Sequence, residues 1–145
     1  MPLLLALAAL AGVLLPVQAG INAQLRRPLG SPLAATFVSF LIGTIAVLLV
    51  LLALRPPLAL SGAWERSSWW HWTGGLLGAA YVLLSIVLAP RLGAATLIAA
   101  VVAGQMITSL VLDQFGLVGF PFHPITPVRI AGAMLIIAGV LLIQR

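Results

Sequence analysis

Five long apolar runs occupy most of the chain, and they constrain its fold more than any other feature. The runs cover approximately residues 2–23, 33–54, 72–89, 93–112 and 127–143. Each has about 17–22 residues, which at about 1.5 Å per residue is enough to cross a hydrocarbon core of about 30 Å. Because backbone groups in lipid must pair within their own segment, the runs are predicted to form transmembrane α-helices.

The composition excludes a soluble globular domain. Hydrophobic residues make up 63% of the chain and charged residues 6%, whereas soluble domains have about 45–50% and about 25%. Seven basic and two acidic residues are too few to cover a water-facing surface. We therefore expect an all-α polytopic membrane protein, in which residues 1–145 form a single domain of five transmembrane helices within the lipid bilayer.

Several functional classes are excluded by what the chain lacks. It has no His-Ser-Asp set, no Gly-rich phosphate loop with Lys and no paired carboxylates, so we do not expect an enzyme. There is no cysteine, and His71 and His123 lie in separate links, so neither a metal site nor a cofactor is expected. The arginines are scattered at helix ends, which argues against a nucleic-acid partner.

The first apolar run has a second interpretation. Val17-Gln18-Ala19 after an apolar stretch is similar to a signal-peptidase site. A signal peptide normally carries a basic residue ahead of its apolar stretch, and none is present here. We therefore interpret the run as the first transmembrane helix.

The links between the runs carry interfacial residues. Four tryptophans lie close together beside charged residues in the second link, at Trp64, Trp69, Trp70 and Trp72. Tryptophan is enriched at membrane–water interfaces, so an interfacial belt is expected there rather than an aromatic ligand cage.

The arginines are divided almost evenly between the two ends of the predicted helices. With five helices, one side of the membrane carries Arg55, Arg66 and Arg129. The other side carries Arg26, Arg27, Arg91 and Arg145. Since an excess of Lys and Arg in cytoplasmic links normally sets orientation, three against four leaves almost no bias.

The charge balance predicts that the chain inserts in both orientations and forms an antiparallel homodimer. Such a dimer has its two-fold axis in the membrane plane, which is the symmetry of inverted-repeat transporters. A weak bias that still fixes one orientation, or pairing with an oppositely oriented paralogue, are the alternatives.

Gly132 and Gly139 lie seven residues apart, on one stripe of a left-handed crossing, and are the predicted dimer contact. Packing within one subunit is the alternative for these glycines.

Polar residues inside the apolar runs indicate where a substrate binds. Gln105 lies near the middle of the fourth run, and Ser109 follows one turn later. Gln18 and Asn22 are also four residues apart, and Tyr81 lies near the middle of the third run. Because polar groups in lipid need partners, these side chains are predicted to line a polar cavity. The alternative is that such groups bridge neighbouring helices or bond back to their own helix.

Two further features bear on mechanism. Pro16 removes a backbone donor inside the first helix and frees the Gly12 carbonyl, so a kink is predicted there. Asp113 is the only carboxylate near the hydrocarbon region. It is a candidate coupling group; the alternative is that it simply pairs with Arg129 across the fourth link or reaches water.

Three stretches resemble a five-helix, half-length branch of the drug/metabolite transporter superfamily. They are Pro16-Val17-Gln18-Ala19-Gly20-Ile21-Asn22, Gly30-Ser31-Pro32-Leu33-Ala34-Ala35-Thr36 and Gly104-Gln105-Met106-Ile107-Thr108-Ser109. The last run, from Gly132 to Gly139, is similar to the final helix of small multidrug resistance proteins. Unlike those proteins, this chain has a fifth helix and no glutamate in its first helix.

The resemblance implies an antiparallel pair of half-length units that acts as a secondary transporter in a bacterial inner membrane. We therefore expect a multi-pass protein that moves a small polar or amphipathic metabolite by alternating access. The alternative is a non-transporting membrane subunit that stabilises or regulates a larger partner. A scaffold of that kind has little reason to carry Gln105 in mid-helix, which favours the transporter.

Overall fold

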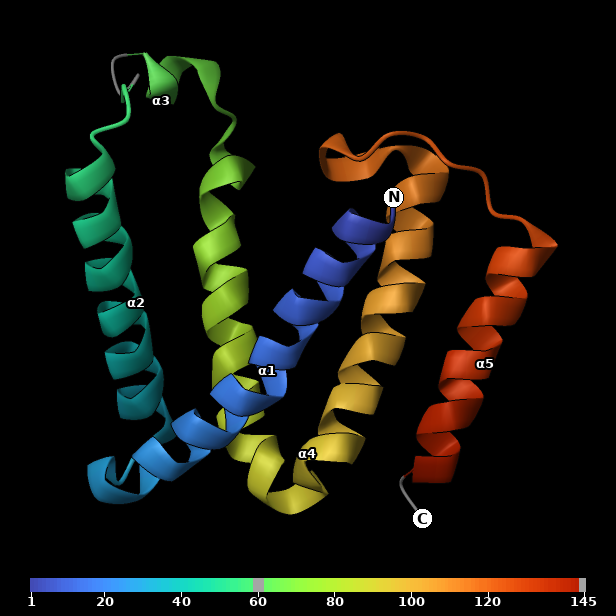
Figure 1. Ribbon diagram of the computed structural model, residues 1–145, viewed down its shortest axis with the longest axis horizontal. Coiled ribbons are helices and arrows are strands. Elements are labelled where there is room, and N and C mark those ends of the chain that lie inside the picture. The colour runs from blue at the N-terminus through green and yellow to red at the C-terminus, as the bar shows by residue number, and fades with distance from the viewer. Residues whose placement is uncertain (59–61, 144–145) are drawn as a thin grey trace. The chain divides into compact units, whose positions relative to one another are not determined.

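The computed structural model describes residues 1–58 and 62–143, and every regular element in these ranges is helical. The elements are α1 (Pro2–Leu29), α2 (Pro32–Leu54), α3 (Ala63–Arg66), a 3₁₀ turn (Trp69–Thr73), α4 (Gly74–Phe115), a second 3₁₀ turn (Leu117–Gly119) and α5 (Pro127–Ile143) (Figure 1). The expectation for Arg145 and that for the Trp64 side chain lie outside what the structure describes.

Within these described ranges, three helical stretches are long and apolar enough to cross a membrane. They are Pro2–Leu29, Pro32–Leu54 and Trp69–Phe115. The α5 helix is equally apolar in character but shorter, at 17 residues. The all-helical prediction is thus confirmed for the described chain, and the Trp69, Trp70 and Trp72 side chains are exposed at the start of the third stretch.

The first helix extends further than expected. The sequence prediction ended it at about residue 23, where the apolar run ends, but α1 continues to Leu29. The intervening residues include Gln24, Leu25 and Arg26, which are good helix formers. The helix ends before Gly30, whose φ of 67° is left-handed. Ser31 then caps α2, because its hydroxyl accepts a hydrogen bond from the Ala34 amide at 3.4 Å.

The α4 helix consists of two helical arms separated by a backbone break. A straight helix of 42 residues would be about 63 Å long, roughly twice the hydrocarbon thickness. Gly93 interrupts it with φ 75° and ψ 164°, a left-handed φ that favours glycine. The predicted separation of the third and fourth runs is therefore present as a break at Gly93, three residues after Pro90.

The chain divides into two compact units, which are described separately. Unit 2 comprises Val17–Pro90, and unit 1 comprises Met1–Pro16 together with Arg91–Arg145. The core of unit 2 is a cluster of Ala35, Val82 and Ile86, against which Leu25 and Tyr81 pack. This cluster joins the last turns of α1, the start of α2 and the first arm of α4.

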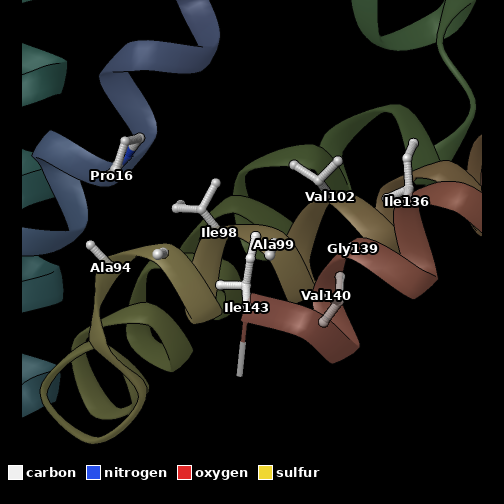
Figure 2. A pocket seen from close by; sticks show the side chains of 10 residues that line it. Pro16, Ala94, Ile98, Ala99, Val102, Ile136, Gly139, Val140 and Ile143 are labelled. Atoms are coloured by element: carbon white, nitrogen blue, oxygen red, sulfur yellow. The ribbon is translucent and has the colours of Figure 1, made fainter. Parts of the chain in front are cut away.

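Unit 1 is built around the second arm of α4 and α5. An apolar groove of about 510 Å³ lies between these helices, and Figure 2 shows the side chains that line it. Small residues make the groove wide, since Ala95 and Ala99 of α4 lie opposite Gly139 of α5. Pro16 of α1 also lines the groove, within the same unit.

Candidate functional site

Two buried polar groups in unit 2 have no partner. The Asn22 residue is only 4% exposed, and its Nδ2 makes no hydrogen bond with any described residue. The hydroxyl of Tyr81 is also buried and unpartnered. Native structures rarely leave buried donors unpaired, and such groups mark functional sites or positions where a water or ligand binds. Asn22 and Tyr81 are therefore the strongest members of the predicted site within unit 2.

Other buried hydroxyls of unit 2 are satisfied by their own helices. Thr36 donates to the Pro32 carbonyl at 2.9 Å, and Ser85 donates to the Tyr81 carbonyl at 2.8 Å. These local bonds explain how Thr36 and Ser85 are buried without a ligand. The contrast with Asn22 separates polar groups that packing satisfies from candidate binding residues.

Gln18 and Asn22 differ in burial, although they are one helical turn apart. Asn22 lies on the buried face of α1 next to Ala19, whereas Gln18 is exposed. Gln18 therefore lies outside the buried part of unit 2, and its role in a cavity stays a prediction. The kink at Pro16 also stays a prediction, since α1 remains helical through that residue.

The second arm of α4 carries a groove in unit 1 whose surface is mostly apolar; it is called the polar groove of α4 below because three of its lining side chains are amides or hydroxyls. Its volume is about 510 Å³, and every lining residue comes from α4 itself. Ala100 and Gly104 are its smallest lining residues, and Gln105, Thr108 and Ser109 supply its polar groups. The groove thus follows one face of a single helix and is open along its length.

The polar groups in this groove differ in how they are satisfied. Ser109 donates to the Met106 carbonyl at 2.9 Å, within its own helix. The Gln105 side chain is exposed and makes no hydrogen bond with the described residues. An amide in mid-helix has two donors and a carbonyl acceptor to satisfy. Of the predicted residues in unit 1, Gln105 is therefore the one that most requires an external partner.

The predicted site residues fall into both units. Gln18, Asn22 and Tyr81 belong to unit 2, and Gln105 and Ser109 belong to unit 1. Each unit thus contains polar side chains without hydrogen-bond partners among the described residues. Whether both sets line one cavity stays a prediction.

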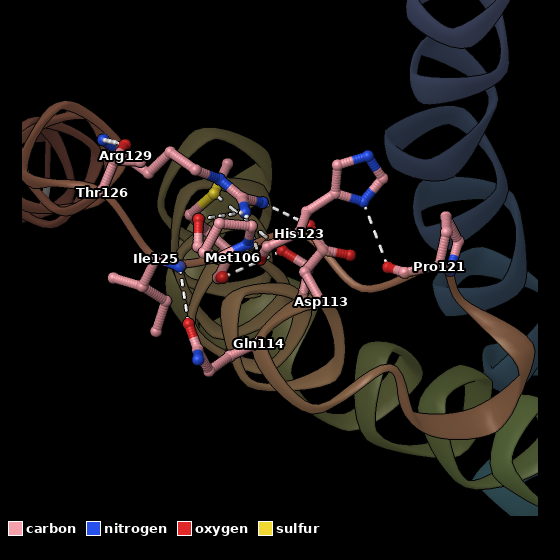
Figure 3. A network of polar contacts seen from close by, with 10 residues as sticks. Met106, Asp113, Gln114, Pro121, His123, Ile125, Thr126 and Arg129 are labelled. Carbon is pink, nitrogen blue, oxygen red and sulfur yellow. Dashed lines mark hydrogen bonds and ion pairs between the residues drawn. The ribbon is translucent and has the colours of Figure 1, made fainter.

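Asp113 forms an ion pair with Arg129, as one of the two sequence interpretations predicted. The pair is the centre of a polar network that holds the link between α4 and α5, and Figure 3 shows its hydrogen bonds. Arg129 also donates to the carbonyls of His123 and Pro124, at 3.1 and 3.4 Å. The His123 amide in turn donates to the Asp113 carbonyl at 2.8 Å.

Gln114 is a member of this network that the sequence reasoning missed. Its Oε1 accepts a hydrogen bond from the Ile125 amide at 2.6 Å. Thr126 caps the start of α5, because its hydroxyl accepts from the Arg129 amide at 3.3 Å. The only available signal was the position of Gln114 directly after Asp113, at a helix end where side chains commonly bond to loop amides.

The Asp113→Asn variant is expected to loosen this link. The substitution removes the charge that Arg129 requires, while two carbonyl contacts of Arg129 remain. Both side chains of the pair are partly exposed, at 32% and 23%, so the expected loss of local stability is about 1–2 kcal/mol.

Hydrogen exchange of the amides in residues 116–126 measures this loss. The matched control is Glu65→Gln, which neutralises the other acidic residue of the chain and should leave these amides unchanged. Equal exchange in Asp113→Asn and in the unmodified protein would mean that the ion pair does not hold the link.

The two glycines of α5 have open surroundings within the chain. A Cβ atom placed on Gly132 or Gly139 would meet no atom within 4 Å. Gly139 lines the apolar groove of unit 1, and Gly132 is exposed. Neither glycine is required by a close approach inside the chain, and their role in a dimer stays a prediction.

Comparison with known proteins places this architecture among membrane transport proteins. The family model described as "Putative inner membrane exporter, YdcZ" matches residues 3–142. The curated protein "Inner membrane protein YdcZ" of Escherichia coli (strain K12) is 32% identical over 135 residues, which cover 93% of this chain and 90% of that protein. No solved structure matches the chain.

Proposed function

Since this chain belongs to the YdcZ family of inner membrane exporters in the drug/metabolite transporter superfamily, we propose that it is a secondary transporter working by alternating access. It is a multi-pass protein of a bacterial inner membrane. Its substrate is a small polar or amphipathic metabolite, which it exports. The observation that carries the proposal is the exposed, unpartnered Gln105 in the polar groove of α4.

The proposed topology has five membrane crossings. The break at Gly93 divides α4 into arms of about 28 Å and 33 Å at 1.5 Å per residue, and each is close to the thickness of a hydrocarbon core. With α1, α2 and α5 the total is five. An odd number places the two ends of the chain on opposite sides of the membrane.

The proposed working unit is an antiparallel dimer. In a single chain the polar groove of α4 is open, so Gln105 would face acyl chains unless a second protein surface covered it. An intramembrane polar side chain is stable when it faces a protein interior or a water-filled cavity. An inverted copy provides such a cover, and the near-equal arginine counts on the two sides favour both orientations.

The residues proposed to bind the solute are Gln105 and Ser109 in unit 1, and Gln18, Asn22 and Tyr81 in unit 2. Alternating access requires parts of the protein to move relative to each other. The chain passes between its two units at Pro16 and again at Pro90, so a proline lies at each crossing point. Gly132 and Gly139 are proposed to contribute to the dimer contact. Asp113 is proposed as the coupling group, which would act by releasing its ion-pair partner Arg129 during transport.

An experiment on whole cells tests export even while the substrate is unidentified. The chain is expressed in a bacterial strain that lacks its own YdcZ, and small molecules in the medium are measured by mass spectrometry. We expect at least one metabolite to accumulate in the medium with the unmodified chain, and to accumulate at least about fivefold more slowly with Gln105→Leu. A folded protein that changes no metabolite in cells, and mediates no flux in liposomes, would instead be a non-transporting subunit.

A further inference from the structure

Unit 2 contains hydrogen-bond donors that lack acceptors, and they indicate the chemistry of the solute. The Nδ2 of Asn22 and the hydroxyl of Tyr81 are both buried and both without a partner among the described residues. The hydroxyls of Thr36 and Ser85 nearby in the sequence are satisfied by backbone carbonyls. The unit therefore satisfies its structural polar groups and leaves two donors available.

Arg26 lies on the same face of α1 as Asn22. In the last turns of α1, Ala19 and Asn22 are buried, and Ala23 and Arg26 are partly buried. These positions have the spacing of one face of a helix. Arg27 is exposed, so the two adjacent arginines have different environments, and only Arg26 shares a helical face with the buried Asn22.

The donors of α1 and α4 are connected through one packed cluster. Leu25, which is three residues after Asn22 and therefore its neighbour on the helix surface, packs against the cluster of Ala35, Val82 and Ile86. Tyr81 packs against the same cluster from α4. The inward face of α1 and the tyrosine thus border a common core within unit 2.

Nothing in the described chain neutralises Arg26. It makes neither a hydrogen bond nor an ion pair with any described residue. The chain has two acidic residues; Asp113 is paired with Arg129 in unit 1, and Glu65 is exposed in α3. Arg26 is partly buried as a residue, and the planar geometry of a guanidinium matches carboxylate and phosphate groups.

We propose that unit 2 binds the transported solute through an oxyanion group, a carboxylate or a phosphate, with Arg26, Asn22 and Tyr81 as the donors. The inference rests on the proposed transport function and adds the charge class of the solute. An oxyanion accepts hydrogen bonds from all three side chains, whereas a cationic solute would meet a positive charge and no carboxylate. The phosphodiester of an anionic lipid has the same chemistry, so the experiment must separate the two sources.

Thermal unfolding of the purified full chain in phosphatidylcholine nanodiscs provides the test. The probes are lactate, succinate, benzoate and inorganic phosphate, with lactamide, succinamide and benzamide as neutral matches. A ligand that binds only the folded protein raises its apparent stability. We expect at least one anion to raise the unfolding temperature while its amide does not. Arg26→Gln should weaken that anion's apparent affinity by about tenfold or more, and Arg27→Gln should leave it unchanged.

Two further variants keep the test decisive if Arg26→Gln does not fold. Arg26→Lys retains the charge and should retain a weakened anion response, and Tyr81→Phe removes only the hydroxyl and should also weaken it. A response that is equal for anions and amides, or equally reduced by the Arg26 and Arg27 variants, would overturn the proposal.

Other outcomes identify the true partner of Arg26. If only added phosphatidylglycerol stabilises the protein, and does so through Arg26, the ligand is a lipid headgroup and the solute assignment is wrong. If anions raise the unfolding temperature of the Glu65→Gln variant but not that of the unmodified chain, Arg26 is paired with Glu65 of an inverted copy. The proposal then fails. Unimpaired export of a cation by Arg26→Gln overturns the charge class but leaves the transport function intact. Absence of any export or flux overturns the transport function, whatever the anion binding.

Discussion

Export is expected to fall by about 5- to 150-fold when Gln105 is replaced by leucine, while the protein remains folded. The amide of Gln105 is the unsatisfied group in the polar groove of α4. A hydrogen bond to a buried polar partner contributes about 1–3 kcal/mol when its loss leaves that partner unpaired. At about 1.4 kcal/mol per tenfold, this range corresponds to the expected loss. The measurement is the initial rate at which the metabolite identified in the medium appears.

A matched control distinguishes a binding role from a general effect of losing an amide. Gln24 is also an exposed glutamine on an apolar helix, but it lies on α1 and not in the groove. Gln24→Leu is expected to keep export within about twofold of the unmodified chain, as is typical of surface substitutions. If Gln105→Leu behaves like Gln24→Leu, the groove of α4 is not part of the transport path.

Two variants that each insert in one orientation, opposite to each other, are expected to lose export when either is expressed alone. Export is expected to return when the two are expressed together. Leu58→Arg with Phe122→Arg and Arg27→Gln changes the arginine count from three against four to five against three. Leu29→Arg with Arg55→Asn changes it to two against five. Asparagine suits position 55 because its φ of 46° is left-handed. Each variant alone should insert mainly one way, and only co-expression should supply both halves of an antiparallel dimer.

The absence of cysteine in the chain allows orientation to be measured directly. A single cysteine at the exposed position Leu117 can be labelled in spheroplasts with a membrane-impermeant maleimide. We expect about half of the molecules to react when this cysteine is the only change in the chain. In each orientation variant, we expect nearly all or nearly none of the molecules to react. Full export by one variant that labels as a single orientation would exclude the antiparallel dimer.

The helices could be predicted because their signal is local. An apolar run long enough to cross a membrane is helical whatever surrounds it, since only a helix satisfies its backbone in lipid. The helix ends were less predictable. The end of α1 at Leu29 depends on the left-handed backbone at Gly30, whereas the prediction followed the end of the apolar residues.

The site could be predicted in its residue types but not in its burial. Gln18 and Asn22 are one turn apart, and nothing in the sequence separates them. Their difference arises from tertiary packing, because the face of α1 that carries Ala19 and Asn22 is the buried one. The pairing of Asp113 was predictable, since few charges are available in its vicinity and Arg129 begins the next helix.

The importance of Arg26 was not predictable from composition. As a sequence feature, Arg26-Arg27 is a pair of equivalent basic residues at a helix end, which is typical of interfacial anchors. The structure distinguishes them because the helical period places only Arg26 on the buried face of α1. A sequence-only prediction would require the extent of α1 beyond residue 23, which the apolar run did not indicate.

The prolines at positions 16 and 90 have a mechanical consequence. Each lies inside a helix at the place where the chain leaves one compact unit for the other. A proline has no amide hydrogen, so one backbone hydrogen bond of the helix is missing at each of these positions. We therefore expect α1 and α4 to bend more easily at these two positions than at their other turns.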